Sequence, residues 1–417
     1  MILLGGDVNA LSVARSLSRL GVRVYGLGVA PAVEWSRHVR PIRVPDTGSD
    51  AESAWAECLL GPATDHLRGA VVLAASDVGL LLVARHREEL ERRFLLDTSH
   101  VPAQLAMLDK LCSYELATAA GVPTPRFWRC DGLDDLQRHR EELVFPLLVK
   151  PLLSHEYQAA FSGLAKFRIA HDMDELRAGQ RELSDAGIGV VLVEQIPGPD
   201  DLLCSYYTYL DAEGVPTFDF TKRVPRRHPP GMGLGCYHVT DWNPAVRDVA
   251  LRLFKYAGLL GVANAEFKLD VRDGQLKLIE CNARFTAANC LLVAAGIDLP
   301  RHVYLRILGE ESELPIGYRT GLRLIHHGAD VRAFLALRRH GALRAATWLR
   351  SLIRPQTFAV WRWDDPLPAV RRSEVWARIA MMRHVGARAA RKVWQPRTRR
   401  AMPDKGVSDR ANRSRRR

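Results

Sequence analysis

The sequence predicts an α/β protein in which an open α/β sheet is followed by a larger region of mixed α+β character. Three observations lead to this fold class. The N-terminus reads as strand, Gly5-Gly6 turn, helix and strand; apolar and amphipathic segments alternate from about residue 100; and residues 266–284 read as a β-hairpin. Strands that alternate with helical segments are typical of layered α/β architectures.

The N-terminal part forms the first expected α/β unit. Its strands are expected over Ile2 to Leu4, Val22 to Leu27 and Ala70 to Ala75, and its helices over Leu11 to Leu20 and Val78 to Leu90. The Gly5-Gly6 pair does not complete a G-x-G-x-x-G pattern, which disfavours a dinucleotide cofactor. Asp77 follows the third strand and could be a ligand at the carboxyl edge of the sheet. We interpret it chiefly as a helix cap.

The middle of the chain alternates shorter helices and strands. We expect helices over Lys110 to Ala120, Leu133 to Leu143 and Met173 to Ala186, strands over Phe127 to Arg129, Pro146 to Lys150, Lys166 to Ala170 and Val190 to Gln195, and a loop at Ser162-Gly163. After Pro197 longer strands are expected over Leu203 to Leu210 and Val215 to Thr221, followed by a helix over Ala245 to Tyr256. Beyond about Leu314 the chain is rich in Arg and Trp, which indicates a small appended helical region.

Composition is that of an ordinary globular protein. The chain has 417 residues, of which 47% are hydrophobic and 25% charged, and no apolar stretch approaches the roughly 20 residues of a membrane span. The N-terminus enters an apolar strand without a basic leader, so we expect a cytoplasmic, uncleaved protein. The seven cysteines are scattered and lack the close pairs of a zinc site, which predicts free buried thiols.

The net charge of +12 is concentrated at the end of the chain. Residues 383–417 hold 13 Lys or Arg and two Asp, a net charge of +11. This segment is poor in apolar residues, which predicts a largely disordered tail. It could contact nucleic acid or an anionic membrane surface. We interpret it instead as a solubilising or adventitious extension and base no function on it.

The expected hairpin at 266–284 brings acidic side chains together. Asp273-Gly274 is a strong turn signal between two alternating runs. With a three-residue loop, Glu266 lies directly across from Glu280 at a Cβ separation of about 5 Å, where like charges destabilise a sheet. A cation would remove this penalty. The alternative is a solvated acidic hairpin whose counter-ion is Arg284.

Two further polar side chains share the face of Glu280. Asn282 and Arg284 follow it at intervals of two residues, the period of a strand. Two carboxylates and an amide oxygen suit Mg²⁺, whose shell is commonly completed by phosphate oxygens. Arg284 could then hold a phosphate or a developing oxyanion.

Two strand ends earlier in the sequence hold further candidate ligand-binding groups. Lys150 ends an apolar run before Pro151, and an ammonium on such a strand needs either a phosphate or a carboxylate of the fold as its partner. Glu194, Gln195 and Ile196 end a β-branched strand before a Pro-Gly-Pro turn. Backbone groups exposed at such an end can read an adenine edge.

The order of these parts resembles the ATP-grasp superfamily, which includes biotin carboxylase and D-alanine:D-alanine ligase. The shared order is Asp109-Lys110, Val149-Lys150-Pro151, Val193-Glu194 to Gly198 with acidic residues after it, Thr221-Lys222-Arg223, and Glu266 with Glu280-Cys281-Asn282-Ala283-Arg284. The resemblance covers about residues 1–310 and points to the predicted carboxylate-amine ligases of that superfamily.

The resemblance implies a role for each matching residue. Lys110 and Lys150 would contact ATP phosphates, and Lys222 or Arg223 would add a third contact at the reacting phosphate. Glu194, Gln195 and Ile196 would hold adenine, with Asp200 or Asp201 at the ribose. Glu266, Glu280 and Asn282 would bind Mg²⁺ or Mn²⁺, and Arg284 would steady the substrate or intermediate.

Two positions depart from the superfamily pattern. The loop after Lys150, a glycine-rich flap in many relatives, has only Gly163 between Pro151 and Lys166. Ala283 stands where Pro or Thr is common, a mild change because the flanking ligand side chains are intact.

The implied fold is an ATP-grasp fold with a Rossmann-like pre-ATP-grasp domain and a helical C-terminal extension. The expected boundaries are 1–98 for the first domain, 99–314 for the ATP-grasp domain with a lid-like module at about 122–192, 315–382 for the helical region and 383–417 for the tail.

The implied activity is ADP-forming ligation of two small molecules, a carboxylate and an amine. MgATP would convert the carboxylate into an acylphosphate, which the amine would capture. An alternative is a non-catalytic ATP-binding protein that presents its C-terminal region to a partner. An alcohol or thiol acceptor and a homo-oligomer are also compatible with the sequence.

Overall fold

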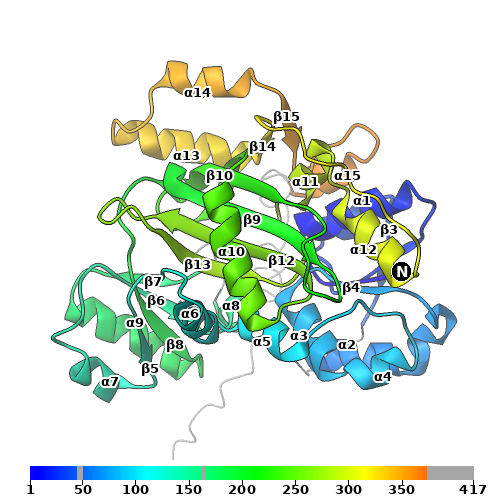
Figure 1. Ribbon diagram of the computed structural model, residues 1–417, viewed down its shortest axis with the longest axis horizontal. Coiled ribbons are helices and arrows are strands. Elements are labelled where there is room, and N and C mark those ends of the chain that lie inside the picture. The colour runs from blue at the N-terminus through cyan, green and yellow to red at the C-terminus, as the bar shows by residue number, and fades with distance from the viewer. Residues whose placement is uncertain (45–49, 162–165, 373–417) are drawn as a thin grey trace, which may run out of the picture. The chain divides into compact units, whose positions relative to one another are not determined.

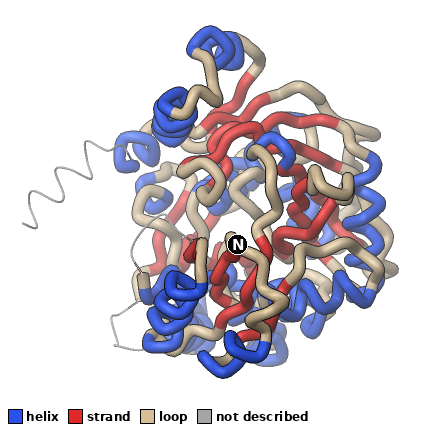
Figure 2. The backbone as a smooth tube through the Cα atoms, turned by 90° about the vertical axis from the view of Figure 1, so that its left-hand side faces the viewer, coloured by secondary structure: helices blue, strands red, loops and turns tan. Residues whose placement is uncertain are grey.

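The computed structural model describes residues 1–44, 50–161 and 166–372, which form three β-sheets with helices packed on them (Figures 1 and 2). The expected tail at 383–417 and the loop at Ser162-Gly163 lie outside the described residues. All seven cysteines are free, as expected. None of the helices in the described ranges is long and apolar enough to cross a membrane.

The N-terminal sheet is parallel and has the strand order β3-β2-β1-β4. Its strands are β1 (Ile2–Leu4), β2 (Val24–Leu27), β3 (Val39–Ile42) and β4 (Val72–Ala74). Helix α1 (Val8–Ser18) packs on one face, while α2 (Ala51–Leu60), α3 (Asp77–Arg85) and α4 (Arg87–Glu91) pack on the other. Two 3₁₀ helices, η1 (Val33–Trp35) and η2 (Pro62–Leu67), lie in the connections.

The strand order reverses between β1 and β4, which is where open α/β sheets bind ligands. At this edge a side chain on Gly5 would lie only 2.1 Å from the Ser76 hydroxyl, so the Gly5-Gly6 turn and the end of β4 are in contact. Ser76, not Asp77, caps α3 by accepting a hydrogen bond from the Gly79 N–H. The capping role expected for Asp77 was therefore wrong, and its carboxylate is left for a contact described below.

The second sheet is antiparallel, with the order β5-β8-β6-β7. Its strands are β5 (Phe127–Cys130), β6 (Leu147–Pro151), β7 (Arg168–Ala170) and β8 (Val190–Glu194). Helices α7 (Leu133–Arg138) and α9 (Met173–Asp185) pack on it around a core of their own. A helix, α8 (Ser154–Ala160), occupies much of the stretch between Pro151 and Lys166.

The main sheet has seven strands in the order β13-β12-β9-β10-β11-β14-β15. They are β9 (Leu203–Leu210), β10 (Phe220–His228), β11 (Leu234–Asp241), β12 (Gly261–Leu269), β13 (Leu276–Asn282), β14 (Arg323–Ile325) and β15 (Gln356–Phe358). The strand expected over Val215 to Thr221 was misplaced, since β10 begins only at Phe220. Pro216 forms an isolated bridge to Leu210 instead.

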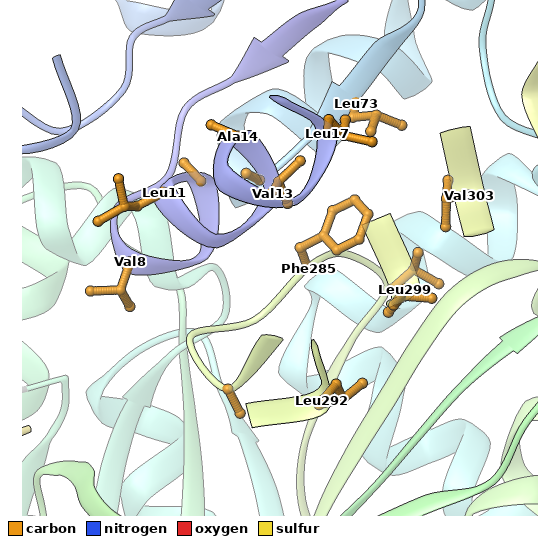
Figure 3. Close-up of a cluster of buried hydrophobic side chains, with 14 of the residues drawn as sticks. Val8, Leu11, Val13, Ala14, Leu17, Leu73, Phe285, Leu292, Leu299 and Val303 are labelled. Atoms are coloured by element: carbon orange, nitrogen blue, oxygen red, sulfur yellow. The ribbon is translucent and has the colours of Figure 1, made fainter. Parts of the chain in front are cut away.

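Helices cover both faces of the main sheet. On one face lie α5 (Val101–Leu108), α6 (Lys110–Ala119) and α10 (Pro244–Ala257). Part of the other face packs with α1, α11 (Asn289–Ala295) and α12 (Leu299–Ile307) in the cluster of Figure 3, where α1 meets Phe285, Leu292 and Leu299. Asp109 caps α6 by accepting from the Cys112 N–H, so Lys110 is the first residue of that helix.

The C-terminal region is mainly helical, as expected, but β14 and β15 join it to the main sheet. Its helices are α13 (His327–Arg339), α14 (Ala345–Leu352) and α15 (Leu367–Arg372), the first two lying beside β14 in Figure 1. Arg226 of β10 donates to both oxygens of Asp330 at 2.6 and 3.2 Å, and the Trp348 indole donates to Asp330 at 2.8 Å. This buried contact fixes α13 and α14 on the sheet.

A second buried ion pair ties the C-terminal region to the N-terminal sheet. Arg15 of α1 donates to a carboxylate oxygen and to the carbonyl of Asp365, both at 2.9 Å. Ser36 and the Arg37 N–H donate to the same carboxylate at 2.7 and 3.2 Å. The side chains of Arg15 and Asp365 are 5% and 1% exposed, so neither charge has water as an alternative partner.

Replacing Asp365 by Ala is expected to destabilise the protein by about 3–5 kcal/mol, because Arg15 would keep a buried charge without a counter-ion. Denaturant unfolding measures the change. The matched control is Asp364→Ala, since the Asp364 side chain is half exposed and bonds only to Arg362 beside it. This control should lie within about 0.5 kcal/mol of wild type. Equal stabilities for the two variants would contradict the role given to Asp365.

Candidate active site

One face of the main sheet carries a row of polar and charged side chains across four strands. Glu280 of β13 lies opposite Glu266 of β12, Glu266 lies opposite Ser205 of β9, and Ser205 lies opposite Lys222 of β10. Opposed residues share a face and have Cβ atoms about 5 Å apart. The row therefore has two carboxylates at one end and an ammonium group at the other.

The predicted opposition of Glu266 and Glu280 is confirmed, but the backbone reaches it by another route. The strands are joined by residues 270–275 rather than by a three-residue loop. A register shift between Glu266 and Phe267 leaves Ile279 without an opposite residue. This β-bulge turns Glu280 back to the face of Glu266.

The two carboxylates are available to a ligand. Neither accepts a hydrogen bond or lies in an ion pair within the described part of the chain. Burial by itself would raise the pKa of Glu280, but the nearby ammonium groups of Lys166, Lys110 and Lys150 hold it below its usual value. Glu280 is thus an anion at neutral pH.

Asn282 completes the oxygen atoms on this face. Its Nδ2 donates to Oδ1 of Asn264 at 3.2 Å, so its own Oδ1 is turned away from Asn264. Within the described ranges no three His, Cys, Asp or Glu gather as a metal site. A divalent ion here would therefore rely on Glu266, Glu280, the Asn282 oxygen and oxygens of a bound ligand, a donor set that fits Mg²⁺ or Mn²⁺.

Two of the predicted phosphate lysines approach the acidic end of the row. Lys110 donates to the Ser154 hydroxyl at 2.7 Å, and Lys150 of β6 donates to the Tyr114 hydroxyl at 3.0 Å. Burial lowers the pKa of each to about 8, although the Glu280 carboxylate opposes the shift. Both hydrogen-bond partners are neutral, so each ammonium keeps its charge for an anion.

Tyr114 links Lys150 to strand β13. Its hydroxyl accepts from Lys150 and donates to the carbonyl of Ile279 at 3.0 Å. Ile279 is the bulge residue, so one buried hydroxyl holds both the lysine and the irregularity that turns Glu280. Sequence reasoning missed Tyr114, although its position four residues after Lys110 places both on one helix face.

Lys222 joins the site and Arg223 does not. Lys222 is 1% exposed, donates to the Ser205 hydroxyl at 3.0 Å and lies over the Tyr207 ring at 5.5 Å. Burial lowers its pKa, while the Glu266 carboxylate opposes the shift. Arg223 points to the other face of β10, is half exposed and pairs with Asp241 at 3.8 Å.

The predicted adenine segment lies at the end of β8, with its acidic side chain already occupied. Glu194 accepts from Arg272 at 2.5 Å and from the Arg126 N–H at 3.3 Å. The Gln195 N–H donates to the Pro146 carbonyl at 3.3 Å. The Glu194 carboxylate is therefore engaged within the protein, whereas the Gln195 side-chain amide makes no hydrogen bond within the described residues.

Ile196 offers a backbone group in the same segment. It is 4% exposed, and its N–H has no acceptor among the described residues. Lys268 of β12 donates to the carbonyls of Ile196 and Gly198 at 2.9 and 2.7 Å and so fixes this turn. Sequence reasoning missed Lys268, whose signal is its period-2 spacing from Glu266. A buried N–H without a protein partner is rare in proteins, so this group is left to donate to water or to a ligand.

Of the two predicted ribose residues, one is engaged. Asp200 accepts from Arg227 at 2.6 and 2.9 Å and from the Gly231 N–H at 3.1 Å. Asp201, next to it in the 3₁₀ helix η3 (Asp200–Leu202), is exposed. The Asp201 carboxylate accepts no hydrogen bond within the described residues.

Arg284 is held by the N-terminal sheet. Its Nε donates to Asp77 at 2.5 Å, and both side chains are 16% exposed. Burial would raise the pKa of Asp77, but the Arg284 guanidinium keeps it below its usual value. The carboxyl edge of the N-terminal sheet thus forms one wall of the site.

The sequence is similar to that of a known ligase. No family model matches the sequence. The D-aspartate ligase of Enterococcus faecium is 24% identical over 317 residues, which cover 72% of this chain and 75% of that protein.

Solved structures show the same fold. An L-amino acid ligase from Bacillus licheniformis matches with a TM-score of 0.56 at 20% identity, over 74% of this chain and 73% of that one. The biotin carboxylase domain of 2-oxoglutarate carboxylase from Hydrogenobacter thermophilus, in complex with MgADP, ADP and bicarbonate, matches with a TM-score of 0.57 at 17% identity, over 77% and 73% of the two chains. These matches confirm the fold expected from the sequence.

Replacing Tyr114 by Phe is expected to destabilise the protein by about 1–2 kcal/mol, because the buried Ile279 carbonyl and Lys150 ammonium each lose a partner. Urea unfolding measures this change. Tyr256→Phe is the control, since Tyr256 is 56% exposed, and it should change stability by less than about 0.5 kcal/mol. A Tyr114→Phe variant as stable as the control would refute the bridging role.

Proposed function

Because the chain has the ATP-grasp fold and resembles the carboxylate-amine ligases of that superfamily, we propose that it joins a substrate carboxylate to an amine with MgATP and releases ADP. The observation that supports this most is the row on the main sheet. It combines two unpaired, opposed carboxylates, Glu266 and Glu280, with the ammonium groups of Lys110, Lys150 and Lys222. Phosphoryl transfer needs these two kinds of group, since it depends on positioning and charge neutralisation.

The nucleotide would lie between the second sheet and the main sheet. Its adenine edge would accept a hydrogen bond from the Ile196 N–H, and Asp201 would meet the ribose. Lys110 and Lys150 would hold phosphate oxygens, because their present partners are neutral. Lys222 lies across Ser205 from Glu266 and would contact the transferred phosphate.

Glu266, Glu280 and Asn282 would hold Mg²⁺ or Mn²⁺. When bound, such an ion neutralises charge on the bridging phosphate oxygens and orients them. A bound ion would also offset the repulsion between the opposed carboxylates of Glu266 and Glu280.

The reaction would run in two steps. A substrate carboxylate oxygen attacks the γ-phosphorus, the bond to the β-phosphate oxygen breaks, and ADP leaves with formation of an acylphosphate. The amine then attacks the acyl carbon, inorganic phosphate leaves, and the amine proton passes to solvent or a base. Arg284, held by Asp77 at 2.5 Å, would stabilise the oxyanion that develops on the acyl group.

The acylphosphate has to be kept from water. We therefore assign residues 122–192 as a lid-like module within an ATP-grasp domain at 99–314, after a first domain at 1–98. The C-terminal region would extend from 315 to 382, followed by the tail at 383–417, to which we assign no function.

A non-catalytic ATP-binding protein is the second candidate. Such a protein has no need of unpaired metal ligands, so the free oxygens of Glu266 and Glu280 favour the ligase.

The proposed reaction is tested by coupled ADP release with MgATP and pools of amino acids, other amines and small carboxylic acids. Activity is expected only when a carboxylate and an amine are both present. Glu280→Gln should lower ADP formation at least about 100-fold because a metal ligand is lost. Glu213→Gln, an exposed turn carboxylate, should retain wild-type activity. Unchanged turnover in a folded Glu280→Gln variant would refute the metal assignment.

Nucleotide binding is expected to weaken as the pH rises through about 8. The pKa of Lys110 and of Lys150 is about 8 in the free protein, so these cations are present below that pH and lost above it. One unit above its pKa a lysine is only about 10% protonated, which predicts roughly tenfold weaker binding per lysine.

Calorimetric titration with ADP and Mg²⁺ at pH 7 to 9 measures this dependence. Lys150→Arg is the matched variant, since arginine stays charged over this range, and its pH slope should be smaller. Affinity that is constant from pH 7 to 9 in wild type would contradict the phosphate role of both lysines.

A further inference from the structure

The metal-ligand face holds an orienting residue besides the ligands themselves. We propose that Asn264 is a positioning residue for Asn282. It holds the Asn282 amide so that the oxygen of Asn282, and not the nitrogen, faces the metal; this inference rests on the proposed function. Asn264 lies directly opposite Asn282, two residues along β12 from Glu266. The four residues Glu266, Glu280, Asn264 and Asn282 thus occupy two adjacent cross-strand positions on one face.

The orientation of the Asn264 amide is fixed by the main chain. Its Nδ2 donates to the carbonyl of Tyr206 at 3.0 Å. A carbonyl oxygen can only accept, so the atom that meets it has to be the amide nitrogen. Asn264 is 0% exposed, so water offers no other partner for either end of its amide.

This orientation dictates that of Asn282. With its nitrogen on Tyr206, Asn264 presents Oδ1 to its neighbour and accepts from the Asn282 Nδ2 at 3.2 Å. The reverse orientation of Asn282 would set two amide oxygens against each other. The Asn282 Oδ1 is therefore held on the side away from Asn264, with no partner among the described residues.

The consequence is specific to an amide ligand. A carboxylate offers oxygens on both sides and needs no orientation, whereas an amide binds a hard cation through only one of its two ends. Asn264 is fully buried and already bonded at both ends, so it orients the ligand without being one. Residues that orient metal ligands in this way typically change metal affinity by 10–100-fold when replaced.

The test is Mn²⁺ binding in the presence of ADP, followed by electron paramagnetic resonance of free Mn²⁺. Asn264→Leu keeps the number of side-chain heavy atoms and the branching at Cγ and removes both hydrogen bonds, and it should weaken Mn²⁺ binding at least about tenfold. Asn282→Asp should also weaken binding, because its carboxylate meets the oxygen of Asn264, which Tyr206 holds in place.

The double variant Asn264→Leu/Asn282→Asp separates orientation from general damage. It should bind Mn²⁺ more tightly than either single variant, since a carboxylate beside leucine has no wrong orientation and no opposing oxygen. Thermal unfolding without ligand checks that each variant folds. Asn264→Ala, which also removes the acceptor for Asn282, replaces Asn264→Leu if leucine prevents folding.

The outcomes are distinct. Wild-type affinity in folded Asn264→Leu or Asn264→Ala, or a double variant weaker than both singles, would overturn the orienting role alone. Failure of the wild-type protein to bind Mn²⁺ with ADP would overturn the proposed function, and this inference with it.

Discussion

Two carboxylates held face to face across an antiparallel strand pair, with ammonium groups close by, set the charge balance on which the rest of the site depends. Glu266 and Glu280 repel each other, whereas Lys110, Lys150 and Lys222 are costly to bury without an anion. The attraction between the carboxylates and the nearby ammonium groups lowers the free-energy cost of burying either kind of charge. Because no direct ion pair joins them, both remain able to take up a ligand of the opposite sign.

The fold holds the three ammonium groups and the Asn282 amide in place by giving each a neutral partner. Ser154, Tyr114 and Ser205 accept from the three lysines, and Asn264 accepts from Asn282. Neutral hydroxyl and amide partners fix the positions of charged or ligating groups without consuming charge. Hydrogen bonds thus fix the positions of these side chains, while the lysine and glutamate charges have no direct ion-pair partner among the described residues.

Local sequence signals predicted the parts of this arrangement that depend on strand period and turn chemistry. Asp273-Gly274 and the alternation around it predicted the hairpin, but the opposition of Glu266 and Glu280 was obtained with too short a loop, and the bulge at Ile279 compensates for this difference. β11 was missed because Gly231, Gly233 and Gly235 weaken the strand pattern around its start. Tyr114 and Asn264 do lie at regular spacings from Lys110 and Glu266, but their contacts with the Ile279 and Tyr206 carbonyls join separate elements and cannot be read from one sequence.

The buried pair of Arg15 and Asp365 spans 350 positions of the chain. A polypeptide emerging from the ribosome exposes α1 long before its counter-ion has been translated. Until then the Arg15 guanidinium has only water as its partner, so the buried contact of α1 with residue 365 cannot form. We therefore expect the packing of α1 to be completed late, and a chain that ends before residue 365 to lose stability in its first helix.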